Sequence, residues 1–296
     1  MTVPIDLDVH QRPSTTYRAL WATIAVLLVA AGIAVPIVGS DRSDEETGVS
    51  VSTIAASAAT VEEATSVSSD LQMKIDFGGQ QATIRSESRA DNVAKRGDYT
   101  IAYEGLPVPS FSGVFGDGKF FVRIPESARA QSDGRPWAGA VAPDATDAAN
   151  PAATGSALLR FLAGANGKVT TVGSEEVRDV TTTRYRVDID AAKLVEQGQK
   201  QQSALGFIAP SAAADDAKVK AQPADVWLDA AGRLRRLRLR LEVEAGGQTI
   251  TLEATNELFD YDKAFTVELP AEGDVFATSN VAAAVGLILQ PAPPAS

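Results

Sequence analysis

Apolar and polar residues alternate one by one along four stretches of this chain, and this alternation limits the fold more than any other feature. The stretches are residues 71–77, 182–190, 236–244 and 249–255. Because successive side chains of a β-strand point to opposite faces, each stretch predicts a strand with one buried and one solvated face. The apolar positions, which we expect on one inner face, are Leu71, Met73, Ile75, Phe77, Tyr185, Val187, Ile189, Leu237, Leu239, Leu241, Val243, Ile250 and Leu252.

Four turn sequences, each with glycine, separate strands and predict antiparallel hairpins. They lie at Gly78-Gly79, Gly116-Asp117-Gly118, Ala230-Ala231-Gly232 and Gly246-Gly247. A phosphate-binding loop is the other interpretation of the glycines at 113–118, but no Gly-Lys-Ser/Thr motif accompanies them, so a hairpin is favoured. Further strands are predicted over 81–89, 98–104, 114–115, 120–124, 168–172, 176–180 and 224–229.

Helices are expected to be few and short. They are predicted over residues 53–67, 156–163, 191–205 and 280–289, whereas the weakly periodic stretches 125–153 and 209–222 favour loops. Strands and helices segregated in this way indicate an α+β fold: a large curved antiparallel sheet, or half-barrel, with short helices covering its apolar face. A fully closed barrel is the alternative.

The composition of the predicted helices bears on whether the inner face of the sheet is a packed core or a ligand cavity. They are rich in alanine, and small alanines opposite large aliphatic side chains leave either a thin packed core or an apolar cavity. An apolar cavity would hold a low-polarity ligand by burial alone, whereas a packed core would hold none. Periodicity by itself favours the packed core.

Cysteine and histidine are nearly missing, which excludes most familiar catalytic and metal-binding chemistry. The 296 residues contain no cysteine and one histidine, His10. Disulfides, thiolate or multi-histidine metal centres and cysteine nucleophiles are therefore excluded. The carboxylate pairs Glu175-Glu176 and Asp215-Asp216 lie in polar contexts typical of solvated surface. We therefore predict no enzyme activity, no catalytic residue, no cofactor and no metal.

The charge balance argues against nucleic acid as a partner. The chain has 27 basic and 38 acidic residues and a formal charge of −11, so it repels phosphate backbones. Its one basic run, Arg233–Arg240, alternates with leucine and predicts arginines on the outer face of a strand, where neighbouring glutamates and threonines can pair with them. A basic binding patch is the alternative interpretation.

Residues Ala19–Val38 form an uncharged run of twenty residues. A helix of that length spans about 30 Å, the thickness of a bilayer core. Arginines precede the run and acidic residues follow it, which places residues 1–18, with His10, in the cytoplasm and the rest of the chain outside. A cleaved signal peptide ending at Val38-Gly39-Ser40 and a buried core helix are the alternatives, and the length and all-round hydrophobicity of the run favour an uncleaved anchor.

Three segments resemble the actinobacterial LppX/LprG lipoprotein family, which is related in fold to the LolA and LolB carriers. They are GSEEVRDVTTTRYRVDID at Gly173–Asp190, PADVWLDAAGRLRRLRLRL at Pro223–Leu241 and NELFDYDKAFTVELP at Asn256–Pro270. The resemblance implies a half-barrel sheet wrapped around helices, with a hydrophobic cavity that holds acylated lipids or lipoglycans. It implies no catalytic residue. The family's usual lipid-bearing cysteine has no counterpart here, and the Ala19–Val38 helix is expected to replace it.

These observations predict a membrane-anchored extracytoplasmic protein that holds or hands over acylated lipids or lipoglycans, with the cytoplasmic membrane and an envelope transport protein as further partners. The alternative is a sensor or scaffold ectodomain of the same fold that binds a protein partner. The expected division is a cytoplasmic leader (1–18), a transmembrane helix (19–39), an acidic spacer (40–52), the lipid-binding domain (53–275) and an apolar tail (276–296). The helix expected in this tail has three possible roles: it closes the apolar opening, touches the membrane or docks on the body of the domain.

Overall fold

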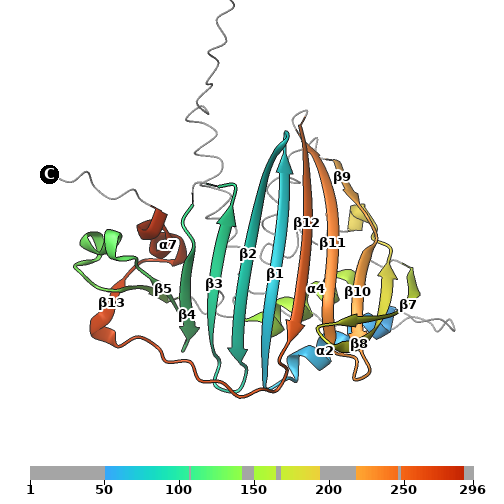
Figure 1. The fold of residues 1–296 in the computed structure, drawn as a ribbon, viewed down its shortest axis with the longest axis horizontal. Helices are drawn as coiled ribbons and strands as arrows, with labels where there is room; N and C mark the ends of the chain where they lie inside the picture. Colours follow the sequence, from blue (N-terminus) through green and yellow to red (C-terminus); the bar gives the residue numbers. More distant parts are fainter. Residues whose placement is uncertain are drawn as a thin grey trace, which may run out of the picture.

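The computed structural model describes residues 51–106, 108–141, 150–164, 168–193, 218–245 and 248–289 (Figure 1). Thirteen strands form one sheet in the order β13-β6-β5-β4-β3-β2-β1-β12-β11-β10-β8-β7, and β9 pairs with β11 beside this path. Every pairing is antiparallel except that of β13 with β6. The strands are β1 (Ser66–Phe77), β2 (Gln80–Asp91), β3 (Arg96–Glu104), β4 (Phe111–Gly116), β5 (Lys119–Arg123), β6 (Trp137–Val141), β7 (Val169–Val177), β8 (Val180–Val187), β9 (Lys218–Ala221), β10 (Ala224–Asp229), β11 (Leu234–Ala245), β12 (Gln248–Phe259) and β13 (Val275–Ala277).

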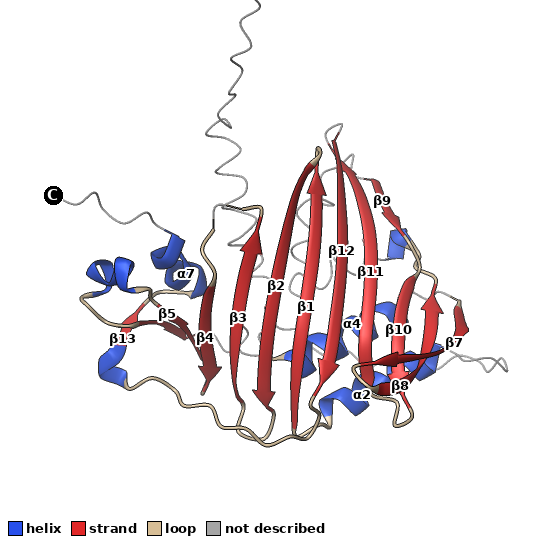
Figure 2. Cartoon of the chain, viewed as in Figure 1, coloured by secondary structure: helices blue, strands red, loops and turns tan. Residues whose placement is uncertain are grey.

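The sheet curves but does not close, because β13 and β7 stand at its two ends (Figure 2). The predicted α+β class and the curved, largely antiparallel sheet are confirmed, and the closed barrel is wrong for the strands described. The centre of the sheet joins the two ends of the chain, since β1 lies between β2 and the late strand β12.

Two helices cover one end of the sheet's inner face, and a third lies near the opposite edge (Figure 2). Helices α2 (Val51–Glu62) and α4 (Pro151–Gly164) pack against each other, with Arg160 ion-paired to Glu62 at 2.5 Å. Helix α7 (Val281–Leu289) packs on β5, β6 and the 3₁₀ helix η1 (Glu126–Ser132), burying Val285 and Ile288. The predicted tail helix is therefore a helix docked on the body. A second 3₁₀ turn, η2 (Glu272–Asp274), precedes β13.

Several predicted boundaries are wrong. The first helix ends at Glu62 rather than Val67, because the chain from Ser66 onward pairs with β2 and β12. The strands predicted over 168–172 and 176–180 are one strand, β7, followed by a turn at Arg178 and Asp179 with φ of 47° and 61°. Two residues with positive φ form the tight turn that matches the twist of a hairpin, and neither residue is a glycine that would have signalled it.

Long-range pairing explains the other differences. The predicted loop 125–153 contains η1, the strand β6 and the start of α4, and the predicted loop 209–222 contains β9. Both short strands exist because partners distant in sequence hold them: β5 and β13 for β6, and β11 for β9. Strand β8 ends at Val187, so Ile189 lies beyond it.

Some predictions fall outside the described residues. These are the leader, the transmembrane helix and the spacer over 1–50, the helix over 191–205 beyond Lys193, the pair Asp215-Asp216 and the turn Gly246-Gly247. Within the ranges described above, no helix is long and apolar enough to cross a membrane.

Candidate functional site

The predicted apolar positions come together on the inner face of the sheet. Cross-strand register places them in rows: Met73 and Leu239 flank Ala254, and Ile75 and Leu241 flank Leu252. Buried positions are Met73, Ile75, Val187, Leu237, Leu239, Leu241, Val243 and Leu252. Half-buried positions are Leu71, Phe77, Tyr185, Ile189 and Ile250. The shared face is as predicted, whereas a role of these residues in lining a lipid cavity stays a prediction.

One end of the inner face is closed by the helices. Gly155 of α4 lies so close to the sheet that an added Cβ atom would stand 2.7 Å from Leu258 of β12, with Val61 and Leu234 within 3.8 Å. Leu258, Val61 and Leu234 are all almost fully buried. The helix pair is therefore packed tightly on the end of β12 that lies toward Phe259.

The middle of the inner face is less enclosed than its surroundings. Leu71 of β1 and Ala254 of β12 are half-buried, although Met73, Leu239 and Leu252 beside them are between 3% and 7% exposed. An alanine is shorter than its leucine and methionine neighbours, so its accessibility indicates free space above the central strands rather than a surface position. This partly accessible patch lies next to the helix-covered end.

Aromatic side chains of β3, β4 and β5 extend the inner face, although they were not among the positions predicted from the sequence. Tyr99 stacks on Phe120 with ring centroids 4.8 Å apart and meets Phe111 edge-on at 6.4 Å. Its hydroxyl donates to the backbone oxygen of Phe121 at 2.9 Å, and burial raises the pKa of Tyr99 well above its usual value. The alternation of Tyr99, Ile101 and Tyr103 was the available signal.

The outer face carries ion pairs, as predicted for the arginine-rich strand. Glu257 accepts hydrogen bonds from Arg236 at 2.8 Å and from Arg178 at 2.6 Å. Arg178, from the β7–β8 turn, also bonds Asp70 at 2.9 Å and lies 3.9 Å from the centre of the Phe259 ring. Because these arginines are paired with carboxylates, they belong to a solvated strand face and do not form a free basic patch.

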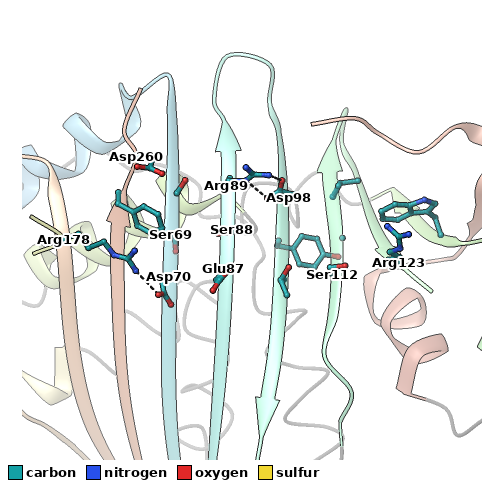
Figure 3. Close-up of a pocket in the computed structure, with 17 residues that line it drawn as sticks. Ser69, Asp70, Glu87, Ser88, Arg89, Asp98, Ser112, Arg123, Arg178 and Asp260 are labelled. Carbon is teal, nitrogen blue, oxygen red and sulfur yellow. Dashed lines mark hydrogen bonds and ion pairs between the residues drawn. The ribbon is translucent and has the colours of Figure 1, made fainter. Parts of the chain in front are cut away.

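A groove of about 720 Å³ runs across this outer face over β1 to β6 (Figure 3). Arg178 and Phe259 border one side, and Arg123 and Trp137 border the other, with Arg123 lying 5.7 Å from the centre of the Trp137 ring. Of the described charged residues that line the groove, Arg123 and Glu87 make no ion pair. The groove is polar, so it differs in character from the apolar inner face.

The carboxylate pair Glu175-Glu176 of β7 lies on the surface of the protein. Glu175 accepts a hydrogen bond from the Trp227 indole at 2.9 Å, and Glu176 is exposed, so this carboxylate pair is surface structure. In the same part of the chain, no group of three or more His, Asp or Glu side chains could hold a metal ion.

Comparison with known proteins gives likeness in fold alone. No family model and no curated protein matches the chain. Among solved structures it is similar to LprF from Mycobacterium bovis, at 12% identity over 75% of this chain and 96% of that chain, with a TM-score of 0.41. It is also similar to the lipoprotein LppX from Mycobacterium tuberculosis, at 14% identity over 74% and 97%, with a TM-score of 0.37.

LprF and LppX both fall in the LppX/LprG family, the family that the sequence motifs resemble. A third similar structure is the MucA/MucB complex of Pseudomonas aeruginosa, at 10% identity over 75% of this chain and 59% of that chain, with a TM-score of 0.27. Identities and TM-scores this low do not bear on what this chain binds, which has to follow from its own geometry.

Proposed function

We propose that this protein binds an acylated lipid or lipoglycan on the inner face of its sheet and holds it or hands it over in the cell envelope. The observation that carries the proposal is the half-buried patch at Leu71 and Ala254, which lies within a largely apolar face. We further propose that Ala19–Val38 anchors the chain in the cytoplasmic membrane, with the described domain on the extracytoplasmic side.

Burial of hydrocarbon supplies enough free energy for such binding. Each methylene removed from water contributes about 0.8 kcal/mol, so a chain of about twelve methylenes contributes on the order of 10 kcal/mol before the costs of ordering are subtracted. The inner face offers aliphatic neighbours on three central strands, from Met73 on β1 through Leu252 on β12 to Leu239 on β11.

We propose a binding role rather than a catalytic one. The polar groups beside the accessible patch are Ser69 and Asn256, and the Ser69 hydroxyl donates to the Asn256 amide oxygen at 3.0 Å. An amide cannot take up a proton from the serine at neutral pH, so this pair does not constitute an activated nucleophile.

Filling the space above Ala254 tests the proposal. The full-length protein is purified from membranes, and the lipid extracted from it is quantified by mass spectrometry for the wild type, Ala254→Phe and Ala102→Phe. Ala102 is also a half-buried alanine, and its register through Arg85 and Gln72 places it on the outer face. We expect Ala254→Phe to carry severalfold less lipid and Ala102→Phe to match the wild type.

Two results would contradict the proposal. A wild-type protein that yields no lipid would exclude a lipid-holding role, and equal lipid content in the two alanine variants would exclude the inner face as the site. Circular dichroism spectra and melting curves of each variant establish that a loss of lipid is not a loss of fold.

The outer-face groove supports a second candidate function, docking of an envelope protein. Arg123 and Glu87 lie three strand spacings apart, about 14 Å, and their charges suit a segment with an acidic and a basic group at that separation. Crosslinking from a photoreactive residue at Ser112 in the groove, with Lys74 outside it as control, should trap one stoichiometric partner. If the same partner is still crosslinked after a double charge reversal, Arg123→Glu with Glu87→Lys, this use of the groove is contradicted.

A further inference from the structure

One polar pair interrupts the apolar inner face. Asn256 of β12 is 3% exposed and Ser69 of β1 is 6% exposed. The Oδ1 atom of Asn256 accepts a hydrogen bond from Ser69 Oγ at 3.0 Å. Polar side chains buried among aliphatic ones are costly unless their hydrogen-bonding groups are used, so each group of the pair needs a partner.

The pair accounts for only part of the hydrogen-bonding capacity of Asn256. An asparagine amide also has two N–H donors on Nδ2, and no acceptor for them exists among the described residues. Among the described residues, Arg129 Nε is the only side-chain polar atom that is fully enclosed by protein and lacks a hydrogen-bond partner. Since Asn256 Nδ2 also lacks a partner but is not such an atom, it retains some access to open space, although the residue as a whole is almost completely buried.

Asn256 lies between the closed and the accessible parts of the inner face. Leu258, two residues along the same strand face, is the residue against which Gly155 of α4 packs. Ala254, two residues in the other direction, and Leu71, directly opposite Asn256 in register, are the half-buried residues of the central patch. An N–H donor thus stands at the edge of the space that we assign to the lipid.

We infer that the Asn256 amide donates a hydrogen bond to a carbonyl oxygen of the bound lipid, so that the site prefers ester-linked acyl chains to chains without a carbonyl. This inference rests on the proposed function and specifies the class of ligand. A ligand without an acceptor at this position would displace water from Nδ2 and leave the donors unsatisfied, which lowers its affinity relative to an ester. In the observed arrangement the Ser69 hydroxyl donates to Oδ1, so Nδ2 is the amide atom left for the ligand.

Two lipids that differ only in the carbonyl groups test the inference. The full-length protein is purified in detergent, and a fluorescent acyl probe bound to it is displaced by a diacyl phosphatidylglycerol or by its dialkyl ether analogue of equal chain length. We expect the wild type to bind the ester about three- to tenfold more tightly, the effect of one hydrogen bond. The double variant Asn256→Leu with Ser69→Ala should bind both lipids equally.

Control variants separate the inference from a general loss of structure. Gln72→Leu removes an amide from the outer face of β1 and should keep the wild-type preference. If the double variant does not fold, Asn256→Asp takes its place, because it keeps the acceptor for Ser69 and removes the N–H donors.

The outcomes distinguish this inference from the proposed function. A wild type that binds both lipids with equal affinity leaves lipid binding standing and overturns the role of Asn256. A preference that persists in whichever Asn256 variant folds overturns it as well. A wild type that binds neither the probe nor either lipid overturns the proposed function itself.

Discussion

Replacing Glu257 by glutamine removes the carboxylate that Arg178 and Arg236 share on the outer face. The side chains are 18%, 39% and 26% exposed, respectively, so the cluster is neither dry nor freely solvated. Fully exposed pairs contribute about 0.2–1 kcal/mol, and breaking a buried pair costs about 3–5 kcal/mol. For this intermediate position we expect a loss of about 1–2 kcal/mol in the free energy of unfolding at pH 7.

The loss should depend on pH in a defined direction. Burial acts to raise the pKa of Glu257, but hydrogen bonds from Arg178 and Arg236 outweigh it, so the folded-state pKa lies below the usual 4.5. A depressed folded-state pKa means that the stabilisation is fully present above the unfolded value and is lost as the pH falls through the folded value. The wild type and the glutamine variant should therefore differ at pH 7 and converge as the pH falls below the usual 4.5 and through the lowered folded-state pKa of Glu257.

Thermal unfolding followed by circular dichroism measures the effect. For a domain of this size, 1 kcal/mol corresponds to about 2–4 °C, so we expect the melting temperature at pH 7 to fall by about 2–8 °C. Glu253→Gln is the matched control, since Glu253 lies on the same face of β12 and has no ion pair among the described residues. Equal melting temperatures for wild type and Glu257→Gln at pH 7, or a difference that persists unchanged at low pH, would refute the reasoning.

Two glycine substitutions should act in opposite directions on the free energy of unfolding, as measured by urea denaturation. A Cβ atom at Gly113 would stand 2.0 Å from the backbone oxygen of Phe121, so Gly113→Ala should lower the free energy of unfolding by about 3 kcal/mol or more. A variant as stable as the wild type would show that the strands separate freely there. Gly286, inside α7, has no atom within 4 Å of an added Cβ, so Gly286→Ala should add about 0.5–1 kcal/mol through helix propensity, and a loss would contradict an open position.

Periodicity was sufficient wherever a strand has one wet face and one dry face. The arginine-rich strand β11 and its neighbour β12 were predicted with their faces correctly assigned, because side chains alternate with a period of two whatever the partner. Strand β6 was missed since its sequence, WAGAV, has no alternation, and it becomes a strand only by pairing with β5 and β13. The turn at Arg178 was missed for a similar reason, since the hairpin imposes positive φ on an arginine, which does not favour it.

The candidate site shows the same division. The aliphatic residues of the inner face could be listed from the sequence, and the period of two places Asn256 on the same face. The pattern does not show that its amide pairs with Ser69 and borders an accessible patch. Its position beside Leu71 follows from the register of β12 on β1, two strands that lie about 180 residues apart in the chain.

By itself, the sequence determined the strand periodicity, the two faces of the central strands and, through the absence of cysteine and of all but one histidine, the exclusion of disulfides, cysteine nucleophiles and multi-histidine metal centres. The tertiary structure decided which strands are neighbours, that the sheet stays open between β13 and β7, and where the helices leave the inner face accessible. The physical reason is that side-chain alternation is a local property of the backbone. Register, closure and free space depend on contacts between residues that are distant in sequence, and no local pattern records those contacts.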